Sequence, residues 1–143
     1  MKRIIILSLL VLTTLALKAQ NGLRIMPLYE GKIIPQERLV ETRVRGKMLS
    51  EYHLSFFHSI SFTGTKEEAQ SVYSLMKEEN VFASEYQGKK VKTLMLQLPR
   101  KDEKNRFLCY KSKQKGERCE VTVIYMEGTL TSLEELNKTL NMK

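Results

Sequence analysis

The chain has 143 residues, a length that fits one domain with room for a hydrophobic core and argues against several domains. Its formal net charge of +8 indicates solubility and a weak attraction to anionic surfaces, but it does not identify a partner. The two cysteines lack Cys-x-x-Cys spacing, which argues against a redox role.

A secretory signal peptide is predicted over residues 1–19. A basic start and an apolar run over residues 4–17 precede Ala19, the small residue expected before the cleavage point. A transmembrane anchor is the alternative, but the run is shorter than the roughly 20 residues that a bilayer requires, and Lys18 ends it. We therefore expect a periplasmic or secreted protein that does not span the membrane after cleavage, with residues 20–143 as a single domain.

The first part of that domain is poorly patterned. Prolines and glycines interrupt residues 20–38, and we expect only a short edge strand there, at Leu23–Ile25. Branched and charged side chains then alternate over Val40–Arg45. Spacings of four residues within this region also fit a helix, but the β-branched residues and Gly46 favour a strand followed by a turn.

The clearest pattern in the chain is a period of two over residues 52–62, which is typical of a half-buried strand. One face of this strand is mostly apolar or aromatic and should point into the core: Tyr52, Leu54, Phe56, His58, Ile60 and Phe62. The other elements are expected to pack on this face.

Two helices are predicted. Thr65 and Glu68 have the spacing of a capping box, and an apolar stripe follows with helical spacing and ends near Asn80: Ala69, Val72, Tyr73 and Met76. A second capping box over residues 131–135 begins a C-terminal helix, with Leu133, Leu136 and Leu140 on one face.

Between the helices, Ser84–Lys90 reads as a polar loop. Three strands follow, at Val91–Leu98, Arg106–Lys111 and Cys119–Glu127, and their short charged connections favour antiparallel hairpins. The fold class is therefore α+β, with a mainly antiparallel sheet of about five strands, one helix inserted after the Tyr52–Phe62 strand and one C-terminal helix. Both helices could cover one face and leave the other face, or its rim, for a partner.

Several stretches together resemble a known family: Asn21-Gly22-Leu23, residues 27–31, residues 52–60, Leu96-Gln97-Leu98-Pro99, residues 105–110, residues 123–128 and residues 133–136. The family is a domain-of-unknown-function family of small exported proteins from gut-dwelling Gram-negative bacteria. The resemblance implies location and one compact domain, and it carries no enzymatic motif.

Cys109 and Cys119 are candidates for a disulfide in an exported chain. A hairpin turning near Gln114 would place them opposite one another, within reach of the bond. A turn centred on Lys115-Gly116 would shift the register, separate the sulfur atoms and leave two buried thiols.

His53 and His58 lie an odd number of residues apart, so on a regular strand they point to opposite faces and cannot ligate one metal ion. His58 is expected to be a hydrogen-bonded core residue. The sequence contains no nucleophile elbow, P-loop or dinucleotide-binding motif, so we assign no catalytic residue, metal ligand or cofactor.

Basic residues gather where an antiparallel sheet would place one end. They form a candidate anion-binding rim: Lys89, Lys90, Lys92, Lys111, Lys113, Lys115 and Arg118. Residues 100–106 form a second basic group at the other end. Few aromatic residues accompany the rim, so nucleic acid is not the expected ligand. Solvated loops are the plain alternative to a binding rim.

Three functions stay open from the sequence. The first is a non-enzymatic binding or interaction domain whose partner is an envelope protein or an anionic glycan. The second is a small periplasmic hydrolase or isomerase that uses a histidine in a cleft. The third is a structural subunit that assembles through an edge strand.

Overall fold

The computed structural model describes residues 23–79 and 81–141. Its centre is a six-stranded antiparallel sheet: β1 (Val40–Arg45), β2 (Leu54–Thr65), β3 (Phe82–Gln87), β4 (Val91–Lys101), β5 (Lys104–Lys115) and β6 (Arg118–Gly128). Around it lie α2 (Met26–Tyr29), α3 (Lys66–Lys77), α4 (Leu133–Asn141) and two 3-10 helices, η1 (Gln36–Arg38) and η2 (Lys47–Tyr52). The predicted α+β class and antiparallel sheet are confirmed, with six strands in place of about five.

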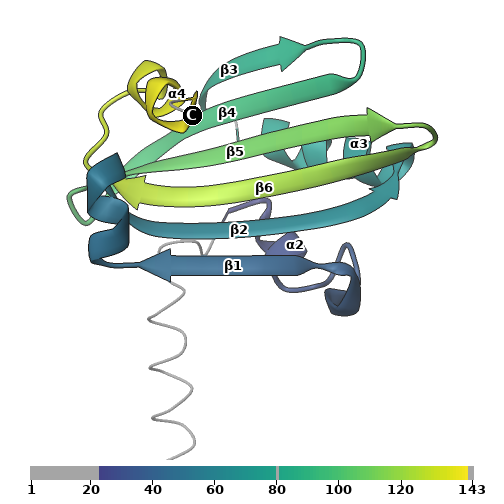
Figure 1. Cartoon of the computed structure of the whole chain (residues 1–143), viewed down its shortest axis with the longest axis horizontal. Coiled ribbons are helices and arrows are strands. Elements are labelled where there is room, and N and C mark those ends of the chain that lie inside the picture. The colour runs from purple at the N-terminus through teal and green to yellow at the C-terminus, as the bar shows by residue number, and fades with distance from the viewer. Residues whose placement is uncertain (1–22, 80, 142–143) are drawn as a thin grey trace, which may run out of the picture.

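The strand order is β1-β2-β6-β5-β4-β3, so β1 and β3 form the two edges of the sheet (Figure 1). Two hydrophobic clusters lie on opposite faces. We call the face covered by α2 and α3 the α3 face, and the face covered in part by α4 and η2 the α4 face. The two predicted helices therefore do not cover a common face, because residues of α3 and α4 belong to different clusters.

Strand β2 has the predicted orientation. Its even-numbered residues from 54 to 62 are all buried, and Phe56, Ile60 and Phe62 contribute to the cluster on the α3 face. Two residues depart from the predicted face: Tyr52 ends η2 and is exposed, and Leu54 packs in the cluster on the α4 face, because the register with β6 shifts between Leu54 and Phe56. The burial follows from the period of two, since alternate side chains leave a strand on opposite faces.

The helix after β2 begins with the predicted capping box. The Thr65 side chain accepts a hydrogen bond from the Glu68 amide, and the Glu68 carboxylate accepts one from the Thr65 amide. The predicted apolar stripe is buried against the sheet, and the helix ends at Lys77, before Asn80. The side chain of Leu140 lies outside the described part of α4.

Two predictions about local structure are wrong. The segment expected as a strand at Leu23–Ile25 leads instead into the short helix α2, whose Ile25 and Leu28 are buried. Proline at the start of that helix is favourable, because its fixed φ suits the first turn. Ser84–Lys90, expected as a loop, lies mostly within strand β3.

The predicted disulfide is also wrong, since Cys109 and Cys119 are both free. A two-residue loop at residues 116–117 joins β5 to β6 and pairs Gln114 with Cys119 and Cys109 with Ile124. Cys119 is thus an odd number of residues from the partner of Cys109, so the thiols point to opposite faces. They are buried in different clusters.

The predicted signal peptide, residues 1–19, lies outside the described residues. Within the described ranges, no helix has the length and apolar character needed to cross a membrane.

Candidate anion-binding pocket

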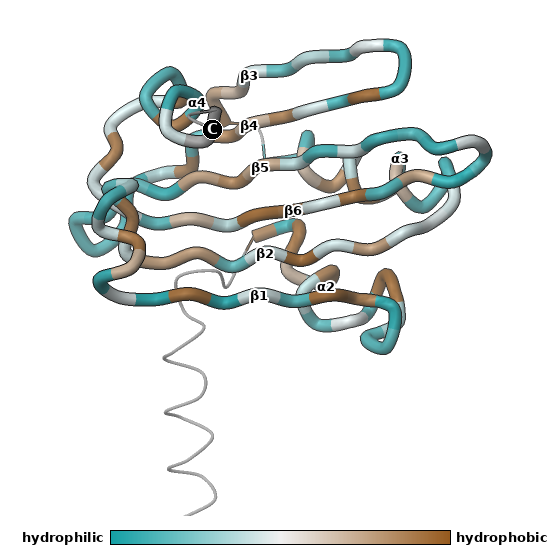
Figure 2. The backbone as a smooth tube through the Cα atoms, in the orientation of Figure 1, coloured by the Kyte–Doolittle hydropathy of each residue, from teal (hydrophilic) through white to brown (hydrophobic). Residues whose placement is uncertain are grey.

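Hydrophilic residues gather at two neighbouring hairpin turns, the β3–β4 turn and the β5–β6 turn (Figure 2). The Gln114 amide donates a hydrogen bond of 2.7 Å to the Lys90 carbonyl, which joins the two hairpins at this end. The second basic group, around residues 100–106, lies at the β4–β5 turn at the opposite end. The sequence therefore placed the two basic groups at the correct ends of the sheet.

The register divides the predicted rim between the two faces. Lys92 shares the α3 face with Leu94, whereas Lys111, Lys113 and Lys115 share the α4 face with Cys109. The predicted rim is therefore not one continuous surface.

Two members of the predicted rim bind other groups of the chain. Lys115 Nζ lies 2.9 Å from Glu120 Oε1, and Arg118 donates a 3.2 Å hydrogen bond to the Thr63 carbonyl. These contacts reduce what either residue can offer to a ligand.

A small basic pocket lies on the α3 face at this end, with a volume of about 170 Å³. Four lysines line it, together with polar groups of α3 and β5: Lys66, Lys89, Lys90, Lys92, Gln70, Ser112 and Gln114. Lys66 was not part of the predicted rim, because its contribution depends on how α3 crosses the sheet. We call this site the basic pocket.

The described residues that line the basic pocket include no acidic side chain. Among the described residues, no carboxylate lies within ion-pair distance of any of its four lysines. Lys92 Nζ lies 3.4 Å from Gln70 Oε1 and 4.3 Å from the centroid of the Tyr73 ring, so its partners are neutral. The positive potential of the pocket is therefore available to an external anion.

A hydrogen bond and a ring contact hold the inner wall of the pocket together. Tyr110 donates a 3.1 Å hydrogen bond to the Ala69 carbonyl and packs edge-to-face on Tyr73, with ring centroids 5.3 Å apart. Burial raises the pKa of Tyr110, against a lowering hydrogen bond with Ser112, so the phenol stays neutral near pH 7. It adds no negative charge to the site, and it fixes α3 against β5.

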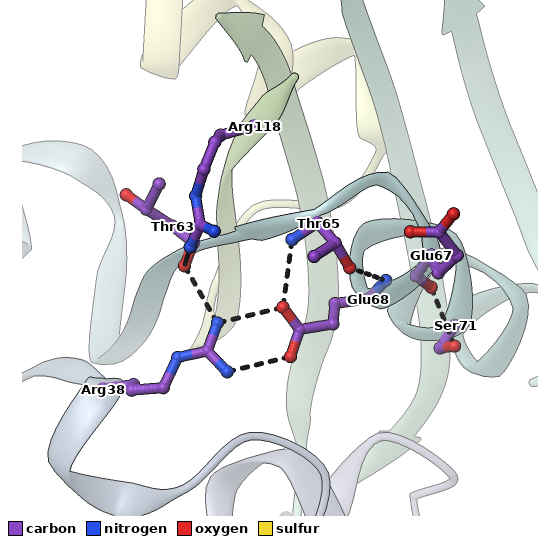
Figure 3. A network of polar contacts seen from close by, with 7 residues as sticks. All are labelled: Arg38, Thr63, Thr65, Glu67, Glu68, Ser71 and Arg118. Carbon is purple, nitrogen blue, oxygen red and sulfur yellow. Dashed lines mark hydrogen bonds and ion pairs between the residues drawn. The ribbon is translucent and has the colours of Figure 1, made fainter. Parts of the chain in front are cut away.

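A polar network, drawn in Figure 3, fixes the start of α3. Lys66 is the first residue of this helix. The Arg38 guanidinium donates two hydrogen bonds of 2.9 Å to the Glu68 carboxylate and one of 3.1 Å to the Thr63 carbonyl. Hydrogen bonds from Arg38 and from the Thr65 amide lower the pKa of Glu68 to about 2. Glu68 therefore stays ionised and holds η1, β2 and α3 together.

The histidines do not form an open site. The side chain of His58 is 1% exposed, packs 4.5 Å from the ring of Tyr29 and lies beside Glu41. His53 lies in the αL conformation after η2, and its carbonyl accepts a hydrogen bond from the Thr129 amide. Within the described residues, no cluster of three or more His, Cys, Asp or Glu side chains could hold a metal ion.

The fold and the pocket define a small α+β domain with a cluster of four lysines at one end of its sheet, none of them ion-paired within the described part of the chain. Residues 12–140 match a family of unknown function, DUF6108, and the chain belongs to that family. Searches of curated proteins and of solved structures found no match.

Proposed function

We propose that this protein is an exported, non-enzymatic binding domain that recognises an anionic group of an envelope glycan through the basic pocket. The observation that carries the proposal is the convergence of Lys66, Lys89, Lys90 and Lys92 on one cavity without an acidic partner among the described residues. Export rests on the basic and apolar pattern of residues 1–19.

The size of the basic pocket limits the class of ligand that it can hold. Pockets for drug-sized ligands and cofactors span about 300–1,000 Å³, whereas this one has about 170 Å³. That volume holds roughly five or six water molecules. It suits one sulfate, phosphate or carboxylate group carried by a larger molecule that stays mostly outside.

The chemistry of the lining supports the same class of ligand. Lysine provides a compact positive charge with three donors, which suits an oxyanion. The Ser112 hydroxyl and the Gln70 and Gln114 amides can donate further hydrogen bonds at the pocket wall. Because Lys89 and Lys90 lie in an exposed turn, a chain-like ligand can approach from the end of the sheet.

The test compares two variants with equal loss of charge. Lys66→Gln/Lys92→Gln removes two pocket lysines, and Lys47→Gln/Lys104→Gln removes two lysines that do not line the pocket. Binding to a sulfated dextran oligosaccharide is measured by calorimetry at several salt concentrations, with neutral dextran as the reference ligand. Thermal unfolding of each variant shows that it is folded.

We expect the pocket variant to bind at least about tenfold more weakly, because each charge-assisted hydrogen bond contributes about 1.5–3 kcal/mol. The matched control should bind like the wild type apart from a small uniform loss, and wild-type affinity should fall as salt screens the lysines. An equal loss in both variants would show diffuse attraction and contradict a pocket.

A further inference from the structure

We infer that two copies of this chain associate through their β3 edges, which pair antiparallel about a two-fold axis at Ser84. Within the described residues, β3 pairs with β4 alone, and all six of its residues are exposed. Two of them are aromatic: Phe82 is 71% exposed and Tyr86 is 61% exposed. The inference does not rest on the proposed glycan ligand, but it shares Lys89 and Lys90 with the basic pocket, so in the dimer Lys66 and Lys92 are the pocket lysines that stay away from the paired edge.

Strand β3 lacks the devices that usually protect a sheet edge, which are lysines, prolines and bulges. Its sequence, Phe-Ala-Ser-Glu-Tyr-Gln, holds one charged residue, Glu85, and that carboxylate lies 3.0 Å from Lys77 Nζ. Its register with β4 is regular along its whole length. The opposite edge, β1, carries Glu41, Arg43 and Arg45 within six residues, so β3 is the less protected of the two edges of the described sheet.

The strand is complementary to itself in one register. A symmetric antiparallel pair centred on Ser84 places Phe82 opposite Tyr86 of the second copy, and Ala83 opposite Glu85. Opposed residues in an antiparallel pair share a face, so the two aromatic pairs form on the α4 face. No like charges meet in this register, because each Glu85 faces an alanine.

The charges that flank β3 favour the same orientation. Glu78 and Glu79 precede the strand, and Lys89 and Lys90 follow it. Antiparallel pairing brings the acidic start of one strand beside the basic end of the other, whereas parallel pairing would bring like charges together. Because the acidic start and the basic end of β3 complement each other in an antiparallel pair, we assign the partner as a second copy of this chain.

The exposed rings of Phe82 and Tyr86 line a groove that a second copy of the chain would enlarge. Phe82 and Tyr86 form one wall of an open groove of about 570 Å³, and Leu133 of α4 forms part of the other wall. A second β3 would lengthen the aromatic wall and cover the ring edges that now face water. Because the symmetric contact uses both β3 edges, it closes at a dimer and does not propagate into a fibre.

The test uses the purified chain without glycan. Sedimentation equilibrium should show a dimer whose fraction rises with concentration, and Tyr86→Lys should shift it to monomer by placing a charge in the aromatic pair. Val40→Lys, which adds the same charge on the β1 edge, should stay dimeric. A second readout is oxidation of Ser84→Cys, because two opposed residues about the axis have Cα atoms within disulfide range.

Ser84→Cys should cross-link at least about tenfold faster than Ser50→Cys, an exposed control in η2, since pairing raises the local thiol concentration. A wild-type chain that stays monomeric at every concentration would overturn the inference. A dimer in which Ser84→Cys cross-links no faster than the control, or in which Tyr86→Lys has no effect, would equally overturn the β3 register. Because no glycan is present, these outcomes leave the proposed function unaffected.

Discussion

The Nε2 atom of His58 lies 2.7 Å from the Oε1 atom of Glu41, where the core meets the edge strand β1. Arg43 Nε donates to the same oxygen at 2.8 Å. Because the ionised Glu41 carboxylate can only accept hydrogen bonds, His58 Nε2 must carry the proton and donate it to Glu41. Arg43 Nε, 3.3 Å from His58 Nε2, is also a donor, so these two nitrogen atoms are neighbours and not a hydrogen-bonded pair. His58 thus binds a carboxylate from within the core.

This arrangement predicts an acid-sensitive step in stability. Burial lowers the pKa of His58, against the hydrogen bond to Glu41, which raises it. The imidazole of His58 is therefore protonated more readily in the unfolded chain than in the folded one. Neutral His58 makes its full contribution to the stability of the fold above about pH 6.5, and that contribution is lost as the pH falls below this value. Urea unfolding from pH 8 to pH 5 should show the decline.

The matched variants for this prediction are His58→Phe and His53→Asn. Phenylalanine retains a ring against Tyr29 but does not titrate, so the decline between pH 6.5 and 5 should flatten. Asparagine tolerates the αL conformation of His53, and that exposed position should leave the wild-type profile unchanged. Identical profiles for wild type and His58→Phe would contradict the account.

Truncation of the inward face of β2 should be costly. Ile60 is 1% exposed, and Ile60→Ala should lower the free energy of unfolding by about 2–5 kcal/mol, since it removes buried methyl groups and leaves a cavity. Val40 in β1 is also branched but is 65% exposed, and Val40→Ala should change stability by no more than about 0.5 kcal/mol. Chemical denaturation measures both, and equal losses would be inconsistent with the observed faces.

The capping box at the start of α3 should contribute measurably. Thr65→Ala removes the acceptor for the Glu68 amide and should cost about 1 kcal/mol. Ser71→Ala, one turn further along, removes only a hydroxyl that donates to the Glu67 carbonyl (Figure 3) and should be neutral or slightly stabilising. A larger loss for Ser71→Ala than for Thr65→Ala would refute the role of the cap.

Glu68 gives the network a second acid-sensitive step. Its pKa is lowered to about 2, below its usual value of 4.5, so its contribution is present above about pH 4.5 and is lost as the pH falls toward 2. Glu68→Gln should remove that part of the acid unfolding curve. An unchanged curve between pH 5 and 2 would show that the network with Arg38 adds nothing to stability.

The free cysteines predict a specific labelling result. Burial raises the pKa of Cys109 to about 12, so this thiol is protonated as well as inaccessible. Without reductant, neither thiol of the native chain should react with iodoacetamide, and the chain unfolded in urea should take up two equivalents. Mass spectrometry separates these results, and an unlabelled unfolded chain would reveal a disulfide.

The parts of the fold that could be predicted are those in which one buried face produces a regular pattern of apolar and polar residues in the sequence. The alternation in β2 and the capped stripe of α3 each report one buried face, and both were predicted. Strand β3 was missed because all six of its residues are exposed, so no alternation of apolar and polar residues marks it. Strand β1 shows a related effect: its branched residue Val40 faces water, while Glu41 reaches the core histidine.

The candidate site was predicted only in outline. Charge spacing located Lys89, Lys90 and Lys92 at one end of the sheet, but it could not show which lysines share a face. That depends on the loop at residues 116–117, whose Gly116 adopts a φ of 62° and sets the β5–β6 register. Lys66 joins the pocket only through the tertiary crossing of α3, for which the sequence carries no local signal.

The most direct test of the basic pocket is a titration of isotopically labelled protein with a sulfated dextran oligosaccharide, followed by amide chemical shifts. We predict saturable shifts centred on Lys66, Gln70, Lys90 and Ser112, and little change around Lys104 at the other end of the sheet. Shifts spread evenly over all exposed lysines, or centred on the β4–β5 turn, would contradict the assignment of this pocket as the anion-binding site.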